Sequence, residues 1–279
     1  MLLARTVRSE WIAALLLALP FHGSAQMLFD GSLGLPTSQG WTYIATGGTE
    51  ASTNNAVLLD TSAHNAYQAG YSDLAGELNR TNGFTVLFTS QLLSETHANT
   101  NRAGFSVIVL ADDHRGLELA FWTNGIFAQS DSPLFTQAEA TNYPTTVFVN
   151  YALTFHPTNY VLTANGTPIL SGPVRDYSAF SGFPDPYSSA NFLFFGDDTT
   201  SAGGAVLLQM VALVTAPKLV ASPDRLITWT GVPNQAYTVQ ASSNLSVWTA
   251  TATVSSTSSQ FSYTNPASAT PSFYRVRYP

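Results

Sequence analysis

The sequence contains no cysteine and very little positive charge. Its 279 residues include ten Lys and Arg, only one of which is a lysine, against seventeen Asp and Glu, so the formal net charge is −7. Without cysteine there can be no disulfide, no thiolate metal ligand and no cysteine nucleophile. So few cations cannot neutralise a row of phosphates, which excludes nucleic acid as a partner. Hydrophobic residues nevertheless make up 45% of the chain, which excludes a largely disordered protein.

Long hydrophobic runs are also missing. The apolar run at residues 11–19 follows Arg5 and Arg8 and precedes the small residues Gly23-Ser24-Ala25. It is much shorter than the roughly 20 residues that a membrane span requires, and the pattern is typical of a secretory signal. We therefore predict a signal peptide over residues 1–25 and an extracellular, secreted protein with no membrane span and no C-terminal anchor. Export without cysteine points to a bacterial protein.

Most of the remaining chain alternates apolar and polar residues with a period of two, which predicts β-strands and turns. The clearest cases are residues 84–89, 105–110, 116–122 and 147–155. Several of these strands are apolar on both faces, as expected where loops or a second sheet cover them. Asn124-Gly125 and Asn165-Gly166 predict tight type I′ hairpins. Strands without intervening helices predict an all-β, two-sheet jelly-roll sandwich.

The chain divides into two predicted units after the signal peptide. Residues 27–214 are long enough for a large sandwich, and residues 215–223 form a proline-containing linker. Residues 224–279 carry four short alternating segments and predict a small C-terminal β-sandwich module. A unit of that size is close to the lower limit for a self-sufficient core.

Short strings in the first unit resemble a known superfamily. Leu28-Phe29-Asp30-Gly31, Gly40-Trp41 and residues 102–109, 116–122 and 194–200 resemble the concanavalin A-like, laminin-G-like jelly-roll domains. The similarity is greatest to the bacterial "choice-of-anchor" type. This resemblance implies a sandwich that binds glycans or proteins, often with calcium, and some relatives are glycoside hydrolases.

The second unit resembles a fibronectin-type-III-like C-terminal module of exported proteins from bacteria such as the Verrucomicrobia and Planctomycetes. The matching strings lie at residues 227–231, 237–248 and 273–276. The module stands where a choice-of-anchor protein would carry its anchoring segment.

Candidate ligand-binding residues gather around one predicted hairpin. Sugar sites use exposed aromatic faces together with a few polar side chains. Trp122 and Asn124 flank the hairpin, Glu118 shares a face with Trp122, and Arg102 and Tyr177 come from neighbouring loops. The alternative for Trp122 is that its ring fills the core.

A catalytic interpretation needs two carboxylates that face one groove. Glu118 is the only acid on its strand, so a partner would come from another strand, such as Glu139 or Asp60. The alternative is a carboxylate paired with Arg102 or Arg115. No catalytic motif is complete, so enzymatic activity stays open, and glycoside hydrolysis is the activity it would have.

The acidic loops at residues 112–115 and 197–200 are candidates for a metal site. Paired aspartates supply the hard oxygen ligands that calcium prefers, and Asp197 and Asp198 are the predicted ligands. The alternative is two solvated acidic turns.

These observations lead to one functional prediction and two alternatives. The prediction is an exported, non-catalytic domain that binds extracellular glycan or another cell-surface or matrix component. The alternatives are a secreted carbohydrate-active hydrolase with an unrecognised carboxylate pair, and a purely structural surface or matrix protein.

Overall fold

The structure is a computed structural model that describes residues 25–183, 185–215, 220–221, 226–230, 236–258, 260–266 and 273–277. The predicted signal peptide lies outside these residues except for Ala25, as does most of the predicted linker. Within the described part of the chain, no helix is both long and apolar enough to cross a membrane.

The chain folds almost entirely as antiparallel strands, as predicted. One sheet has eight strands, with β1 (Ala25–Asp30) paired to β15 outside the main order. That order is β13 (Thr167–Pro173), β12 (Asn159–Ala164), β11 (Val149–Phe155), β6 (Phe84–His97), β15 (Ala202–Thr215), β4 (Ala56–Asp60) and β3 (Thr49–Thr53).

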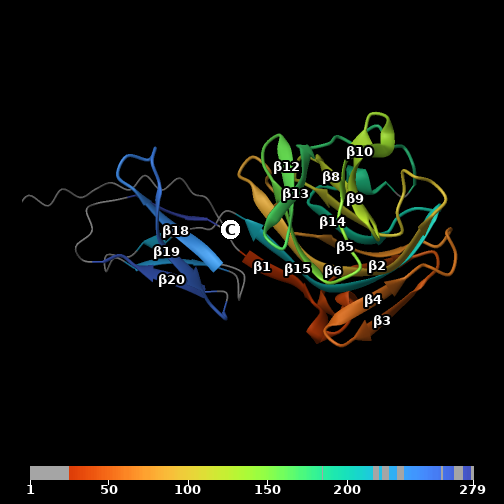
Figure 1. Cartoon of the computed structure of the whole chain (residues 1–279), viewed down its shortest axis with the longest axis horizontal. Coiled ribbons are helices and arrows are strands. Elements are labelled where there is room, and N and C mark those ends of the chain that lie inside the picture. The colour runs from red at the N-terminus through yellow and green to blue at the C-terminus, as the bar shows by residue number, and fades with distance from the viewer. Residues whose placement is uncertain are drawn as a thin grey trace, which may run out of the picture.

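The second sheet has seven strands and lies across the core from the first (Figure 1). Its order is β10 (Leu134–Asn142), β9 (Gly125–Asp131), β8 (Gly116–Trp122), β7 (Ser106–Leu110), β14 (Phe192–Asp197), β5 (Ala69–Leu74) and β2 (Thr42–Ala45). Three short 3₁₀ turns complete the unit: η1 (Gly31–Leu33), η2 (Pro36–Gln39) and η3 (Pro186–Ser188).

Aromatic rings from both sheets meet in the core. The ring of Phe88 on β6 contacts Tyr151 on β11 within its own sheet, and Phe121 on β8 and Phe195 on β14 from the opposite sheet, with centroids 4.9–6.1 Å apart. Such rings bury large apolar areas and prefer these edge and offset contacts. The two-sheet sandwich is therefore confirmed, and its core is continuous from one sheet to the other.

The strands that are apolar on both faces have their outer face covered by a loop. Ile108 and Phe194 point away from the core but are buried, because Tyr177 and Tyr187 from the connection between β13 and β14 pack against them. This cover confirms the prediction made from the double-sided apolar pattern, and it makes the outer face of the seven-stranded sheet a partly enclosed surface.

Both predicted hairpins form, but by different turns. Asn165 and Gly166 have φ values of 49° and 81°, which is the type I′ geometry predicted between β12 and β13. The β8–β9 hairpin instead places Trp122 opposite Gly125, so the turn residues are Thr123 and Asn124. Neither Asn124 nor Gly125 has a positive φ. The type I′ prediction was therefore wrong there, because the strand pairing starts one residue earlier.

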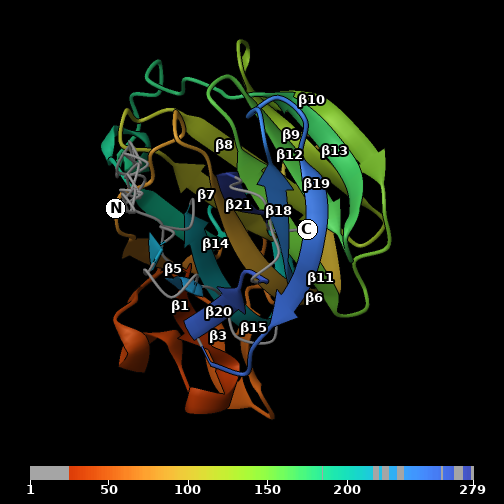
Figure 2. The ribbon, with the colours of Figure 1, turned by 90° about the vertical axis from the view of Figure 1, so that its left-hand side faces the viewer.

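The C-terminal strands form two three-stranded sheets. One has the order β16 (Val220–Ala221), β17 (Leu226–Thr230) and β20 (Gln260–Thr264), and the other has the order β19 (Thr249–Ser255), β18 (Ala236–Ser242) and β21 (Phe273–Arg277). They share a small core that includes Trp229, Tyr237 and Phe261. Figure 1 shows these strands grouped apart from the sandwich, and in Figure 2 they face the viewer in front of it. The boundaries of the units stay a prediction.

Gly104 offers a test of the close packing between the loop after β6 and the start of β15. A Cβ atom at Gly104 would lie 2.2 Å from the carbonyl carbon of Gly203 and 2.4 Å from the nitrogen of Gly204. Gly104→Ala should therefore force backbone movement and lower the free energy of unfolding by about 1–3 kcal/mol. Denaturant unfolding of the purified variant measures this.

Gly76→Ala is the matched control, because a Cβ atom there meets nothing within 4 Å. The control should unfold like the parent protein. Equal stability of the two variants would contradict the tight contact at Gly104.

Candidate functional site

Two connections between strands meet at one end of the seven-stranded sheet and bring the predicted residues together. The β6–β7 connection is joined to the β14–β15 connection by a hydrogen bond from the Ala98 nitrogen to the Ser201 carbonyl oxygen, 2.8 Å long. The β4–β5 connection reaches the same place, because Gln68 Nε2 donates to the carbonyl oxygen of Asp198 at 2.7 Å. These two hydrogen bonds therefore hold the β6–β7, β14–β15 and β4–β5 connections together around the site.

Glu118 is the buried acid of this site. It points outward from β8 but is only 2% exposed, because the aromatic rings of Tyr177, Tyr187 and Phe135 pack together over this face. The Tyr187 hydroxyl donates to Glu118 Oε2. The Tyr177 hydroxyl accepts the Glu118 backbone N–H at 3.1 Å and donates to the Gln129 carbonyl oxygen at 2.8 Å.

Burial changes the protonation of Glu118. Loss of water raises the pKa of this carboxyl group well above its ordinary value, and the charge of Asp198 raises it further. The hydrogen bond from Tyr187 and the positive charge of Arg102 lower it by less. Burial likewise raises the pKa of Tyr187, so its hydroxyl stays a hydrogen-bond donor.

Arg102 and Asp198 are partly exposed as whole residues, although the carboxyl group of Asp198 is enclosed by protein. Burial raises the pKa of Asp198, while a hydrogen bond from Ser106 and the charge of Arg102 oppose the shift. Arg102 Nη1 donates to the carbonyl oxygens of Asn101 at 3.1 Å and Phe135 at 2.7 Å. Among the described residues, no ion pair joins Arg102 to Asp198 or to Glu118.

Asp197 holds the end of the sheet together. It is 1% exposed, and its two carboxylate oxygens accept from Thr61 Oγ1 at 2.6 Å and from the Thr199 nitrogen at 3.1 Å. Burial raises its pKa to about 8, and the charges of Asp198 and Glu95 act in the same direction. The hydrogen bonds from Thr61 and Thr199 lower it by less.

Trp122 supports the β6–β7 connection. Its Nε1 donates to the Arg102 carbonyl oxygen at 2.9 Å, and its ring stacks on His97 with centroids 4.4 Å apart and an interplanar angle of 7°. The edge contact with Phe127 covers more of the ring. His97 thus already occupies one face of the predicted sugar platform. Asn124 lies exposed on the adjacent turn.

Two of the predicted ligand contacts are out of reach. Tyr177 has no exposed surface and Glu118 has almost none, so neither meets a ligand directly as the chain stands. Their contacts are with the protein instead: Glu118 accepts from the Tyr187 hydroxyl, and the Tyr177 hydroxyl donates to the Gln129 carbonyl oxygen. Sequence periodicity places Glu118 on an outer face, but it does not show that a distant loop covers that face.

The predicted partners of Glu118 also change. Glu139 binds Arg175 Nη2 at 2.6 Å, and Asp60 accepts from Ser62, so neither supplies the second carboxylate. Arg115 instead contacts Asp176 at 3.4 Å. Asp198 is the carboxylate that acts on Glu118, from a connection that precedes β15.

The arrangement does not fit the predicted calcium ion. Calcium requires several ionised oxygen ligands around one point. Both oxygens of Asp197 already accept hydrogen bonds, and the Asp198 carbonyl oxygen accepts from Gln68. Across the described ranges, no group of three or more His, Asp or Glu side chains is placed to hold a metal.

Sequence reasoning missed two residues of the site and the contact of a third. His97 belongs to the opposite sheet from Trp122, and Gln129 is 1% exposed with no hydrogen-bond partner for its Oε1. Tyr187 is an aromatic residue of a long loop, but its contact with Glu118 spans 69 residues of the chain and has no local signal.

Comparisons with known proteins describe the fold and no more. No family model matches the sequence, and no curated protein matches it. A solved carbohydrate esterase, vb_24B_21 from the Shiga toxin-encoding bacteriophage phi24B, is 15% identical with a TM-score of 0.48, over 69% of this chain and 97% of that one.

Two other solved structures are similar at the same level. A Bacillus subtilis protein of unknown function with a galectin-like fold is 10% identical with a TM-score of 0.46, over 68% of this chain and 96% of that one. The VIP36 exoplasmic/lumenal domain in its Ca²⁺/Man3GlcNAc-bound form is 10% identical with a TM-score of 0.42, over 71% and 91%. With TM-scores below 0.5, these three structures indicate no function for this chain.

The raised pKa of Asp197 predicts how stability depends on pH. The folded state keeps a proton up to about pH 8, whereas the unfolded chain loses it near the ordinary value of 3.8. Between these values the folded state binds more protons, so stability falls as pH rises and levels off above about pH 8. This group alone contributes at most about 1.4 kcal/mol per pH unit. Denaturant unfolding at a series of pH values measures the slope.

Asp197→Asn isolates this contribution, because an amide resembles the protonated acid and does not titrate. The free energy of unfolding of the variant should fall less steeply between pH 4 and pH 8 than that of the parent protein. At pH 9 the variant should therefore keep a larger fraction of its pH 4 stability than the parent protein does. Parallel pH profiles for the two proteins would contradict a proton held at Asp197.

The poor fit to calcium predicts that the metal has no effect on stability. A ligand that binds only the folded state raises the melting temperature. Because both carboxyl oxygens of Asp197 already accept hydrogen bonds, adding millimolar calcium or EDTA should leave the melting temperature unchanged. A fall on adding EDTA that calcium reverses would restore the calcium prediction.

Proposed function

We propose that this chain is an exported, non-catalytic protein that binds extracellular glycan on the outer face of the seven-stranded sheet. The observation that carries the proposal is the arrangement of Arg102 and Asp198. Both residues are partly exposed, the charge of Arg102 acts on the Asp198 carboxyl group, and no ion pair joins them among the described residues. The unused N–H groups of Arg102 are available to an external partner, and the Asp198 carboxyl group lies behind them in the proposed site.

Their chemistry matches neighbouring hydroxyl groups on a sugar. Only Nη1 of Arg102 donates within the described protein, so its other N–H groups are free to donate to a ligand. The Asp198 carboxylate can accept from a hydroxyl group. A sugar hydroxyl both donates and accepts, so two adjacent hydroxyls can satisfy the two side chains at once. Bonds to charged groups are the stronger kind of hydrogen bond.

Two further groups surround these side chains: an unpartnered amide oxygen and an aromatic ring. The buried, unpartnered Gln129 Oε1 belongs to a side chain whose Nε2 donates to the Asn101 carbonyl oxygen at 2.8 Å, beside Arg102. The ring of Phe135 lies 5.0 Å from the Arg102 guanidinium carbon and is half-buried. Small-molecule sites usually combine a small number of polar groups with aromatic and other apolar side chains.

Replacing Asp198 tests the site. Asp198→Asn removes the charge but keeps the shape, so glycan affinity should fall about tenfold or more, the range for loss of a charged hydrogen bond. A glycan array probed with residues 26–279 identifies the ligand, and calorimetry on the best glycan measures the affinity. The array is scored for both retention and release of products.

Asp112→Asn is the matched control, since it removes the same charge from the β7–β8 turn, where Asp112 contacts Asn79. The control should bind as the parent protein does. Retention on no glycan, or equal loss in the two variants, would reject the proposed site and leave the structural interpretation.

A second candidate function is glycoside hydrolysis, supported by the electrostatic coupling of Glu118 to Asp198. A carboxyl group with a raised pKa next to a second carboxyl group is the pairing that glycoside hydrolysis uses. Against it, Tyr187 covers Glu118, so a substrate reaches that acid only if the connection before β14 moves. Product release in the array experiment, lost in Glu118→Gln, would make this the function.

Export and the C-terminal unit remain part of the proposal. Export is supported by the charged, apolar and small-residue pattern of residues 1–25. The fibronectin-type-III-like assignment is supported by two three-stranded antiparallel sheets around a shared core. We assign this unit the role of a spacer or adhesion module behind the choice-of-anchor-like sandwich.

A further inference from the structure

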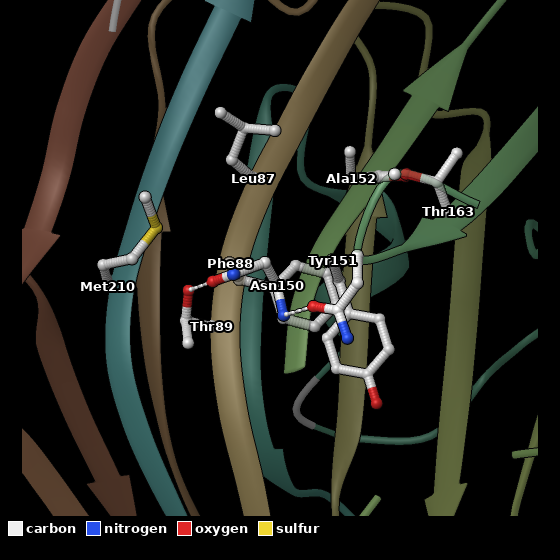
Figure 3. Close-up of a pocket in the computed structure, with 10 residues that line it drawn as sticks. Leu87, Phe88, Thr89, Asn150, Tyr151, Ala152, Thr163 and Met210 are labelled. Atoms are coloured by element: carbon white, nitrogen blue, oxygen red, sulfur yellow. Dashed lines mark hydrogen bonds between the residues drawn. The ribbon is translucent and has the colours of Figure 1, made fainter. Parts of the chain in front are cut away.

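The outer face of the eight-stranded sheet carries a groove that is separate from the site above. It has a volume of about 370 Å³, near the lower end of the range of small-molecule sites. Figure 3 shows the side chains that line it, which come from β15, β6, β11 and β12. The groove crosses the strands rather than following one of them.

Strand register explains the shape of the groove. Thr89 on β6 lies between Met210 on β15 and Asn150 on β11, and in the next row Leu87 lies opposite Ala152. Ala152 is small, and Leu87, Thr89 and Ala152 are almost fully buried, so these three form the floor. Asn150 is exposed and forms part of the rim.

Two asparagine amides at the rim have a defined orientation. Asn150 Oδ1 accepts from Thr89 Oγ1 at 2.8 Å (Figure 3). Asn165 Oδ1 accepts from the Asn150 backbone nitrogen at 3.1 Å. Because each oxygen is held by the protein, each Nδ2 group is left with its N–H donors, and neither donates to a described residue. The rim therefore presents free amide N–H donors, which a ligand with a hydrogen-bond acceptor can bind.

The lining restricts what that acceptor can be. It contains no charged side chain, so the groove has no counter-charge for an anion or a cation. Leu87, Ala152 and Met210 supply apolar surface beside the amides. A ligand that fits has an uncharged carbonyl oxygen next to a methyl group, and it is small enough for a shallow groove.

We propose that this groove is a second glycan site, selective for sugars that carry an acetamido group. The acetamido carbonyl oxygen accepts from the Nδ2 groups of Asn150 and Asn165, and its methyl group packs on Leu87, Ala152 and Met210. The sugar ring hydroxyls face the exposed rim. The inference does not depend on the site at Arg102 and Asp198, because it uses the opposite sheet and different chemistry.

A matched pair of disaccharides tests the selectivity. Di-N-acetylchitobiose and cellobiose differ only in having an acetamido group or a hydroxyl group at each C2. Calorimetry should show binding of di-N-acetylchitobiose and at least about tenfold weaker binding of cellobiose. The reason is that cellobiose lacks the acetamido carbonyl group that would accept from the amide donors. Equal affinity for the two sugars, or no binding of di-N-acetylchitobiose, would overturn the proposal.

Variants then locate the site. Asn150→Asp keeps the acceptor for Thr89 but replaces the amide donors by a charge, so affinity for di-N-acetylchitobiose should fall about tenfold or more. The same change at the exposed turn residue Asn82 should have no effect. Asp198→Asn should bind this sugar as the parent protein does. Loss in Asp198→Asn with normal binding by Asn150→Asp would overturn the second site.

A measurement on the unmodified protein covers the case in which Asn150→Asp fails to fold. In ¹H–¹⁵N spectra, the side-chain amide signals of Asn150 and Asn165 should shift with added di-N-acetylchitobiose and stay in place with cellobiose. Unchanged side-chain signals at saturating sugar would show that the amides do not contact it, which would reject the proposal.

Discussion

The pairing of β6 with β15 is the constraint on which the rest of the sandwich depends. Each strand has 14 residues, and the pairing runs from Phe84 opposite Thr215 to His97 opposite Ala202. Because the strands are antiparallel, the chain leaves β6 and enters β15 at the same end. The connection that carries Arg102 and the connection that carries Asp198, directly after Asp197 at the end of β14, therefore meet there, although nearly a hundred residues separate them.

The consequence is a group of carboxyl groups in a poorly solvated place. Isolated buried charges are costly, and proteins usually pair them or keep them protonated. Here burial raises the pKa values of Glu118, Asp197 and Asp198, and the hydroxyl groups of Thr61 and Tyr187 donate to the carboxyl oxygens of Asp197 and Glu118. Arg102 offsets part of the charge without forming an ion pair, which leaves its donors free. Local departures from a well-satisfied interior are expected at functional sites.

The two outer faces of the sandwich differ in chemistry. The face of the seven-stranded sheet combines acids, one arginine and aromatic rings, and the connection before β14 partly encloses it. The face of the eight-stranded sheet is neutral, with asparagine amides beside small and aliphatic side chains. One all-β framework thus presents a charged and a neutral surface, because alternate residues of every strand face outward and can differ between sheets without disturbing the core.

The sequence by itself determined the architecture, since a period of two, Asn-Gly turns and the absence of helical periodicity depend only on neighbouring residues. It also placed Glu118 and Trp122 on the same face of one strand. Only the tertiary structure decided what each side chain meets there: Tyr187 covers Glu118 across 69 residues, His97 covers Trp122, and Thr61 binds Asp197 across 136 residues. The physical reason is that periodicity defines the direction of a side chain, whereas its partners follow from which strands pair and in which register.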